Sequence, residues 1–340
     1  MSKNQLWDRL KSLAQRHYKI ALALSAVAVL LQIAIKKAVG LMVLPAQWRH
    51  FDSRDHGPAP TGLEEHSDRE LKRDYGLILR AVETIPIAEK TKAPEFRKMI
   101  ICFSPQLMAA SQRYKDYRLL ALSTDSTVIA YDYRGVDRSD GGETNETRVV
   151  NDGLAIVQDL IKEGFNAGNI TLFGTSKGGA VAIKTVAVCR KHHLNVRLIN
   201  DRSFSSYADA FVGLYFSQAS PRVQNFMRRL AHIVLWWTDW RLSVLKDWLS
   251  IPDEDKMLMV AEADNIIDYK LSSLCQAITK SSASKSASVV PVNTPFYPIV
   301  YLYESKAHKG IHCAPLEALV TQDKRPVIEV IKKFLNKQGA

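Results

Sequence analysis

Buried-type strands alternate with helices through the middle of this 340-residue chain, and this alternation constrains the fold more than any other feature. Apolar runs rich in β-branched residues predict strands at 77–85, 98–104, 127–133, 169–173 and 195–200. Helical patterns lie between the later strands at 108–122, 149–164 and 176–192. Strand–helix–strand units of this spacing form right-handed crossovers, so the pattern predicts an α/β fold with a mostly parallel sheet flanked by helices.

The alternation stops after the strand at 195–200 and resumes late in the chain. Residues 204–250 have helical character without a strand, which indicates an insertion. Strands are expected again at 256–261 and 296–303, and a last helix at 317–335. The low-complexity run 281–288 is expected to be a surface loop.

The pentapeptide Gly174-Thr175-Ser176-Lys177-Gly178 joins the strand that ends at Phe173 to the next helix. G-x-S-x-G at such a junction is typical of a nucleophile elbow, because the positions two residues from the serine pack against each other and must be small. One alternative is that Ser176 merely caps the helix. Another is a phosphate loop around Lys177-Gly178-Gly179, but the required Gly-Lys-Thr order is missing. The spacing favours Ser176 as a nucleophile.

From about Arg73 to the C-terminus the chain resembles the α/β-hydrolase fold family of serine hydrolases. Besides the elbow, Asp132-Tyr133-Arg134-Gly135 followed by Arg138-Ser139-Asp140-Gly141 is similar to the family's D-x-R-G-x-G-x-S-x-G loop after its fourth strand. Asp137 replaces the usual glycine of that loop. The block from Ile199 to Ser206 is similar to one in bacterial hydrolases of the chlamydial and Legionella SidB type.

The resemblance implies a catalytic triad in the chain order serine, acid, histidine. In such a triad an imidazole takes the proton of the serine, and a carboxylate orients the imidazole. The stretch 261–267 (AEADNII) resembles the family's G-E-x-D-x-I-I, which implies Asp264 as the acid. Glu262, Asp268 and Asp201 remain alternatives, and Asp264 has the alternative role of a helix N-cap.

The histidine and the oxyanion-hole donors follow from the same resemblance. Of nine histidines, His308 and His312 come after the acid, and the loop 310–316 favours His312 because a glycine-preceded histidine is followed there by small residues and proline. The first oxyanion donor is expected to be the backbone N–H of Lys177. The second comes from the loop 104–107 (SPQL), where the family often has His-Gly.

Proline has no N–H, so within this loop Gln106 is the expected second donor, with Leu107 in reserve.

The N-terminal region predicts a membrane anchor over residues 1–46. Residues 20–35 are apolar except Ser25 and Gln32, basic residues flank them on both sides, and a second apolar patch follows Lys37. A signal peptide and a buried helix are the alternatives, and the symmetric charge leaves membrane sidedness open. Residues 47–72 are polar and are expected to be a linker or cap, so the hydrolase domain would span 73–340.

Net charge and cysteine content indicate which kinds of binding partner and bound group to expect. The net charge of +11 favours an anionic surface, and without zinc-ligand spacing or an RNA-binding signature the chain fits a membrane better than nucleic acid. The four cysteines form no Cys-x-x-Cys pair, so neither a metal site nor a disulfide framework is indicated. No organic cofactor is implied, and the oligomeric state stays undetermined.

The insertion at 204–250 is expected to form a lid that shapes an apolar acyl pocket. It holds four of the six tryptophans, Trp236, Trp237, Trp240 and Trp248, together with several arginines. These tryptophans suit either an interfacial belt against anionic lipid or simple packing of the lid onto the domain.

The sequence therefore predicts a membrane-associated serine hydrolase that cleaves carboxylic esters of lipid or other hydrophobic substrates through an acyl-enzyme. A catalytically silent hydrolase fold that acts as a membrane-tethered effector is the alternative. Acyl transfer to an alcohol would use the same residues.

Overall fold

The computed structural model describes residues 3–44, 64–73, 76–142, 144–285, 299–304 and 310–336. Its described strands form a nine-stranded sheet in the order β1-β2-β4-β3-β5-β6-β7-β8-β9. They are β1 (Glu64–Lys72), β2 (Ile78–Pro86), β3 (Met99–Phe103), β4 (Thr127–Tyr131), β5 (Ile170–Thr175), β6 (Arg197–Asp201), β7 (Lys256–Val260), β8 (Ile299–Glu304) and β9 (Leu319–Thr321). The sheet from β4 to β8 is parallel, and β1, β2 and β9 pair antiparallel at the two edges. The predicted mostly parallel sheet is confirmed.

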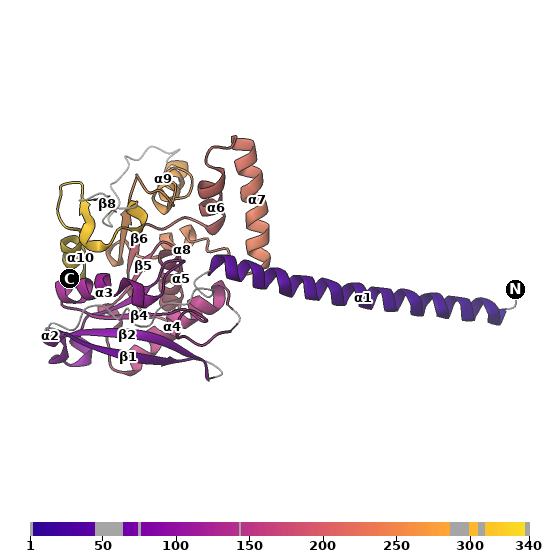
Figure 1. Cartoon of the computed structure of the whole chain (residues 1–340), viewed down its shortest axis with the longest axis horizontal. Helices are drawn as coiled ribbons and strands as arrows, with labels where there is room; N and C mark the ends of the chain where they lie inside the picture. The colour runs from indigo at the N-terminus through magenta and orange to yellow at the C-terminus, as the bar shows by residue number, and fades with distance from the viewer. Residues whose placement is uncertain are drawn as a thin grey trace.

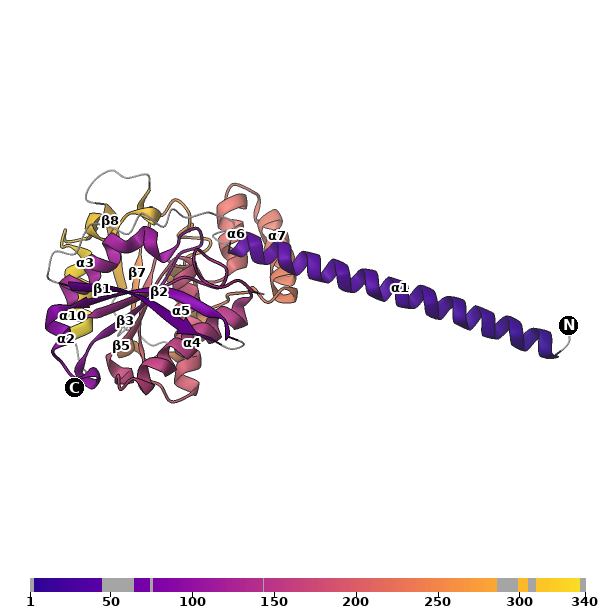
Figure 2. The same ribbon diagram turned by 60° about the horizontal axis from the view of Figure 1, so that its bottom comes forward.

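Helices cover both faces of this sheet (Figures 1 and 2). The α-helices are α1 (Lys3–Val43), α2 (Ile87–Lys90), α3 (Tyr114–Thr124), α4 (Glu146–Lys162), α5 (Lys177–Lys191), α6 (Tyr207–Phe216), α7 (Pro221–Trp237), α8 (Leu245–Ser250), α9 (Leu274–Lys285) and α10 (Val327–Asn336). Short 3-10 helices are η3 (Pro94–Phe96), η4 (Ala110–Arg113), η5 (Ala167–Asn169), η6 (Asp253–Asp255), η7 (Ile311–Cys313) and η8 (Leu316–Ala318). One hydrophobic core lies between the sheet and α4 and α5, and the other between the sheet and α3 and α10.

The central strands are mostly apolar because both of their faces are covered. Every residue of β3, β4, β5 and β7 is buried. Strands covered on two faces are read in sequence as continuous apolar runs, which is why these were recognisable.

Three sequence expectations need correction. Residues 64–72 are strand β1, not linker: β1 pairs with β2 along its whole length, from Glu64 opposite Pro86 to Lys72 opposite Ile78. Its polar sequence EEHSDRELK hid it, because an edge strand is held by backbone hydrogen bonds and needs little apolar surface. The remainder of the expected linker, 47–63, lies outside the described residues.

The C-terminal helix is shorter than expected. Residues 317–335 are not one helix: η8 and the edge strand β9 occupy the first part, and α10 begins only at Val327. Pro326 precedes the helix, and a proline disfavours helical backbone in the residue before it. The run 281–288 is also helical as far as Lys285, because it continues helix α9, which begins at Leu274. Residues 286–288 lie outside the described part.

Helix α1 projects away from the domain (Figure 1). It is 41 residues long, and its segment Leu24–Val43 is long and apolar enough to cross a membrane, with a mean hydropathy of 1.9 and 11% of the segment buried. Its C-terminal end is integrated into the domain, where Gly40, Val43 and Leu44 are buried. An N-terminal apolar helix is thus confirmed.

Candidate active site

Ser176 lies in a sharp turn between β5 and α5. Its backbone has φ 54° and ψ −121°, a strained conformation for a residue with a side chain. Space for this turn comes from glycines: a Cβ on Gly174 would lie 2.3 Å from the Gly178 carbonyl oxygen, and one on Gly178 would lie 2.0 Å from the Phe103 carbonyl oxygen. The backbone N–H of Ser176 donates to the Asp201 carbonyl at 2.8 Å, which joins the turn to the end of β6. The G-x-S-x-G spacing therefore builds a strand–turn–helix elbow.

Three side chains from distant parts of the chain meet at this elbow. Nε2 of His312 lies 3.0 Å from Oγ of Ser176, and Nδ1 of His312 lies 2.8 Å from Oδ2 of Asp264. The other carboxylate oxygen of Asp264 accepts the backbone N–H groups of Ile266 at 2.8 Å and Ile267 at 2.9 Å. Asp264 thus closes a turn and contacts the imidazole, and no helix begins at this turn in the described part of the chain, so the alternative role of a helix N-cap does not apply. All three side chains are largely shielded from water.

The alternative candidates lie elsewhere. Glu262 is exposed. Asp268 accepts the backbone N–H groups of Lys270 and Leu271 in its own turn. Asp201 is fully buried and paired with a neighbouring arginine. His308 lies outside the described residues.

A buried polar network holds the loop that carries His312, and sequence reasoning missed it. Arg202 forms a bidentate pair with Asp201 at 2.7 Å through both Nε and Nη2. Its remaining guanidinium nitrogen, Nη1, donates to the carbonyls of Ile311 and Ala314, on either side of His312. Burial alone would raise the pKa of Asp201, but the adjacent Arg202, together with Arg113 and Thr175, outweighs it and lowers that pKa below its usual value. The consecutive charges of the Asp201-Arg202 pair at a strand end were the available sequence signal.

The comparisons with solved structures agree with this architecture. No known protein-family model matches the sequence. An esterase of Pyrococcus furiosus superposes with a TM-score of 0.56 at 15% identity, covering 86% of this chain and 97% of that chain. The chain has the α/β-hydrolase fold. An esterase/lipase from an uncultured bacterium matches at a TM-score of 0.53 and 13% identity (91% of this chain, 97% of that chain). An esterase of Pyrobaculum calidifontis matches at a TM-score of 0.51 and 14% identity, covering 90% of this chain and 92% of that chain. At such identities the similarity establishes the fold alone.

Within this hydrolase fold, the two expected oxyanion donors border the elbow. Lys177 is the first residue of α5, and Gln106 lines the same cavity as Ser176. Among the described residues, neither backbone N–H donates to a protein acceptor. Each is therefore available to a bound group. The Lys177 side chain points elsewhere: its Nζ lies 4.1 Å from the centre of the Tyr133 ring, and burial lowers its pKa well below the usual value.

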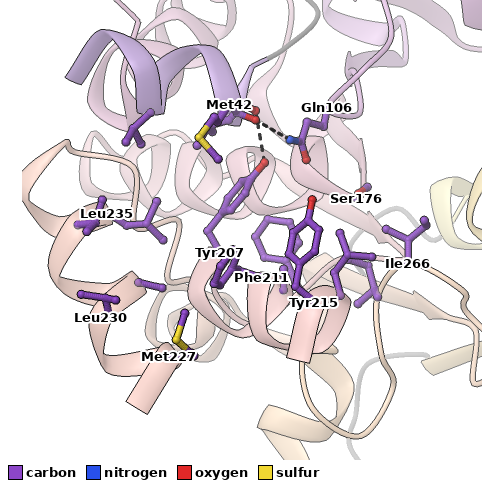
Figure 3. A pocket seen from close by; sticks show the side chains of 18 residues that line it. Met42, Gln106, Ser176, Tyr207, Phe211, Tyr215, Met227, Leu230, Leu235 and Ile266 are labelled. Carbon is purple, nitrogen blue, oxygen red and sulfur yellow. Dashed lines mark hydrogen bonds between the residues drawn. The ribbon is translucent and has the colours of Figure 1, made fainter. Parts of the chain in front are cut away.

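An apolar cavity of about 350 Å³ adjoins the serine (Figure 3). Its walls come from α6, α7, the last turn of α1 and the turn that follows Asp264. Aromatic and aliphatic side chains predominate, among them Phe204, Phe211, Leu214, Met227 and Ile267. A cavity of this size and lining suits a hydrocarbon chain or another hydrophobic group.

The insertion between β6 and β7 is helical, as expected for a lid, and its tryptophans serve two different roles. Trp240 and Trp248 are buried, at 1% and 0% exposure, and belong to the main core. Trp236 and Trp237 are on α7 and are 63% and 39% exposed. Packing therefore accounts for one pair, and the other pair faces away from the domain.

Proposed function

We propose that the chain is a membrane-associated serine hydrolase that cleaves carboxylic ester bonds of lipid or other hydrophobic substrates. The observation that carries this proposal is the continuous chain of hydrogen bonds from Ser176 through His312 to Asp264, beside an apolar cavity. A serine, an imidazole and an orienting carboxylate at these distances form a general-base-activated nucleophile.

In the proposed reaction, the Ser176 hydroxyl oxygen attacks the ester carbonyl carbon while Nε2 of His312 takes the hydroxyl proton. The negative charge that develops on the carbonyl oxygen is stabilised by the backbone N–H groups of Lys177 and Gln106. The C–O bond to the alcohol then breaks, and His312 returns the proton to the departing alcohol. A water molecule, deprotonated by His312, hydrolyses the resulting acyl-enzyme. Asp264 orients the imidazole by accepting its Nδ1–H, and no metal or cofactor takes part.

The lining of the cavity supports a hydrophobic acyl group as the substrate's main recognition element. Hydrocarbon burial contributes about 0.8 kcal/mol per CH₂ group, so a cavity of this kind favours long-chain over short-chain esters. Membrane association is supported by the apolar segment of α1 and by the net charge of +11, which favours an anionic bilayer. Similarity to the SidB-type bacterial hydrolases stays a prediction.

A fluorophosphonate probe, which phosphonylates activated serines, tests the nucleophile. We expect the wild-type protein to be labelled and Ser176→Ala to be unlabelled. Ser203→Ala is the matched control, because Ser203 is also buried near the elbow and should not affect labelling. Absence of labelling in folded wild-type protein would instead support the catalytically silent effector.

A panel of lipid esters, assayed with wild type and Ser176→Ala, then identifies the substrate class. Analysis of the products in the presence of an added alcohol distinguishes hydrolysis from acyl transfer.

A further inference from the structure

The last turn of α1 is built into the acyl cavity. Val39, Met42 and Val43 line the cavity together with Ser176. The Met42 carbonyl oxygen accepts a hydrogen bond from Nε2 of Gln106 at 2.9 Å, and the Val43 carbonyl oxygen accepts one from the Tyr207 hydroxyl at 3.3 Å (Figure 3).

The last four carbonyls of a helix have no partner within it, so these two bonds fix the end of α1 to both sides of the cavity. One of the two partners, Gln106, also carries an expected oxyanion donor. The position of α1 is thus coupled to the geometry of the site.

Helix α7 carries two adjacent apolar stripes. Met227, Ala231 and Val234, spaced four and three residues apart, face the cavity. A second stripe with the same helical spacing is exposed and is formed by Val223, Phe226, Leu230, Ile233 and Trp237. Leu230 belongs to both the stripe and the cavity wall. The cavity lining therefore continues without interruption onto an exposed apolar surface, which we call the α7 outer face and which also includes Trp236, 63% exposed beside Trp237.

The α7 outer face belongs to the end of the domain from which α1 projects. Figures 1 and 2 both show α6 and α7 at this end, and in Figure 1 α7 runs across the direction of α1. A helix that lies across a membrane-spanning segment lies along the bilayer surface. Exposed Arg222 and Arg229 accompany the apolar stripe, as in helices that bind anionic interfaces.

The position of Lys36 and Lys37 in α1 indicates how deep the cavity wall lies relative to the bilayer. At a rise of about 1.5 Å per residue, they precede Val39 by only about one helical turn. Lysines at the end of an apolar span lie at the headgroups. Residues 20–35 supply a rise of about 24 Å, less than the roughly 30 Å of a bilayer's hydrocarbon core, so the apolar segment Leu24–Val43 carries the cavity wall formed by Val39 and Met42 to the level of the headgroups.

We propose that α1 is both the membrane anchor and a wall of the acyl cavity, and that the cavity opens to the bilayer along the seam between α1 and α7. Lipid esters then reach Ser176 from the membrane without passing through water. This inference rests on the proposed function and specifies where its substrate comes from.

Contact between the α7 outer face and lipid can be measured without catalysis. Full-length protein is reconstituted in vesicles of phosphatidylcholine and phosphatidylglycerol with brominated acyl chains, which quench nearby tryptophans. We expect wild type to lose a larger share of its fluorescence than Trp236→Phe/Trp237→Phe. Equal fractional quenching, or a dimer in which this face is protected by a second copy, would overturn the inference.

The route of the substrate is tested with two esters, a soluble p-nitrophenyl butyrate and a vesicle-borne methylumbelliferyl oleate. Ile233→Glu places a charge on the α7 outer face at a position 63% exposed and outside the cavity. It should lower the rate on the vesicle-borne ester about tenfold and change the soluble rate by less than about twofold. Phe96→Glu, at a position 67% exposed in η3, is the matched control and should leave both rates unchanged. An unchanged vesicle rate in Ile233→Glu contradicts the proposed route.

The role of α1 as a wall is tested by chain-length preference in detergent. Val39→Trp fills part of the cavity and should lower the ratio of dodecanoate to butyrate hydrolysis by about tenfold. Val27→Trp, on the exposed part of α1, should keep the wild-type ratio. An unchanged ratio in Val39→Trp excludes α1 as a wall. If wild type cleaves neither ester but its outer-face tryptophans are still quenched, the proposed function fails while the membrane contact stands.

Discussion

At the residue scale, the elbow depends on the absence of side chains around Ser176. The Gly178 position faces the Phe103 carbonyl so closely that even a methyl group requires backbone displacement. Backbone cannot yield as a flexible side chain can, so the cost falls on the β3–β5 core.

We therefore expect Gly178→Ala to lower the free energy of unfolding by about 3 kcal/mol, since overpacking a core is costly. Chemical denaturation measures this. Gly141→Ala is the control, because a Cβ there has nothing within 4 Å and should change stability by less than about 1 kcal/mol. Equal stabilities for the two variants would contradict the tight elbow.

Asp132, in the loop after β4, predicts a pH dependence of stability. Burial raises the pKa of its carboxyl from 3.8 to about 7, although the Ala110 N–H donates to it. Below about pH 7 the folded chain retains a proton that the unfolded chain releases above about pH 4, so this site's contribution to stability declines as the pH rises through that window.

The free energy of unfolding of wild type, relative to Asp132→Asn, should fall by up to about 4 kcal/mol between pH 4 and pH 7. Urea titrations at several pH values give the difference. Parallel pH curves for the two proteins would exclude a buried, proton-holding carboxyl.

At the element scale, the helical insertion combines a packed base with an exposed outer helix. Trp248 in α8 is fully buried, and Nζ of Lys256 lies over its ring, 5.2 Å from the ring centre. Trp236 belongs to the exposed outer helix, α7, and most of its side chain faces solvent.

Trp248→Ala should therefore cost about 3–5 kcal/mol of unfolding free energy, as expected for a large cavity in a core. Trp236→Ala should stay within about 0.5 kcal/mol of wild type. Thermal or urea unfolding of the pair in detergent measures the contrast, and a similar cost for both would mean that α7 is packed more extensively than its exposure indicates.

At the scale of the whole molecule, one buried network joins the segments that converge on the site. Arg202 connects the end of β6 to the His312 loop, and Thr175 donates to Asp201 at 3.0 Å. Arg113 donates to Thr175 at 2.7 Å and pairs with Asp116, which accepts the Leu316 N–H. The elbow, the loop that carries His312 and helix α3 are thus held together by one connected network of hydrogen bonds and ion pairs.

Arg202→Met leaves Asp201 buried without its main partner, so we expect a loss of about 3–5 kcal/mol in unfolding free energy. Displacement of the histidine loop should also slow fluorophosphonate labelling of the protein that remains folded, by at least about tenfold. Arg325→Met removes an exposed ion pair and should cost at most about 1 kcal/mol without slowing labelling. Labelling of Arg202→Met at the wild-type rate would refute the positioning role.

Local sequence determined the sheet, the elbow and the order of the candidate residues. The central strands are buried on both faces and so are mostly apolar, and the turn at Ser176 tolerates only glycine at its close contacts. The polar strand β1 and the short strand β9 escaped prediction, because backbone pairing along a neighbouring edge decides such segments and leaves little trace in side-chain periodicity.

Only the tertiary structure decided which distant groups meet. Asp264, Asp268 and Glu262 lie within a few residues of one another, and the path of the chain after β7 brings Asp264 alone to His312. The same is true of Arg202 and of the last turn of α1, whose contacts with the histidine loop and the cavity span more than a hundred residues. Contacts at that separation depend on how whole elements pack against each other, and the local pattern around each residue carries no record of that packing.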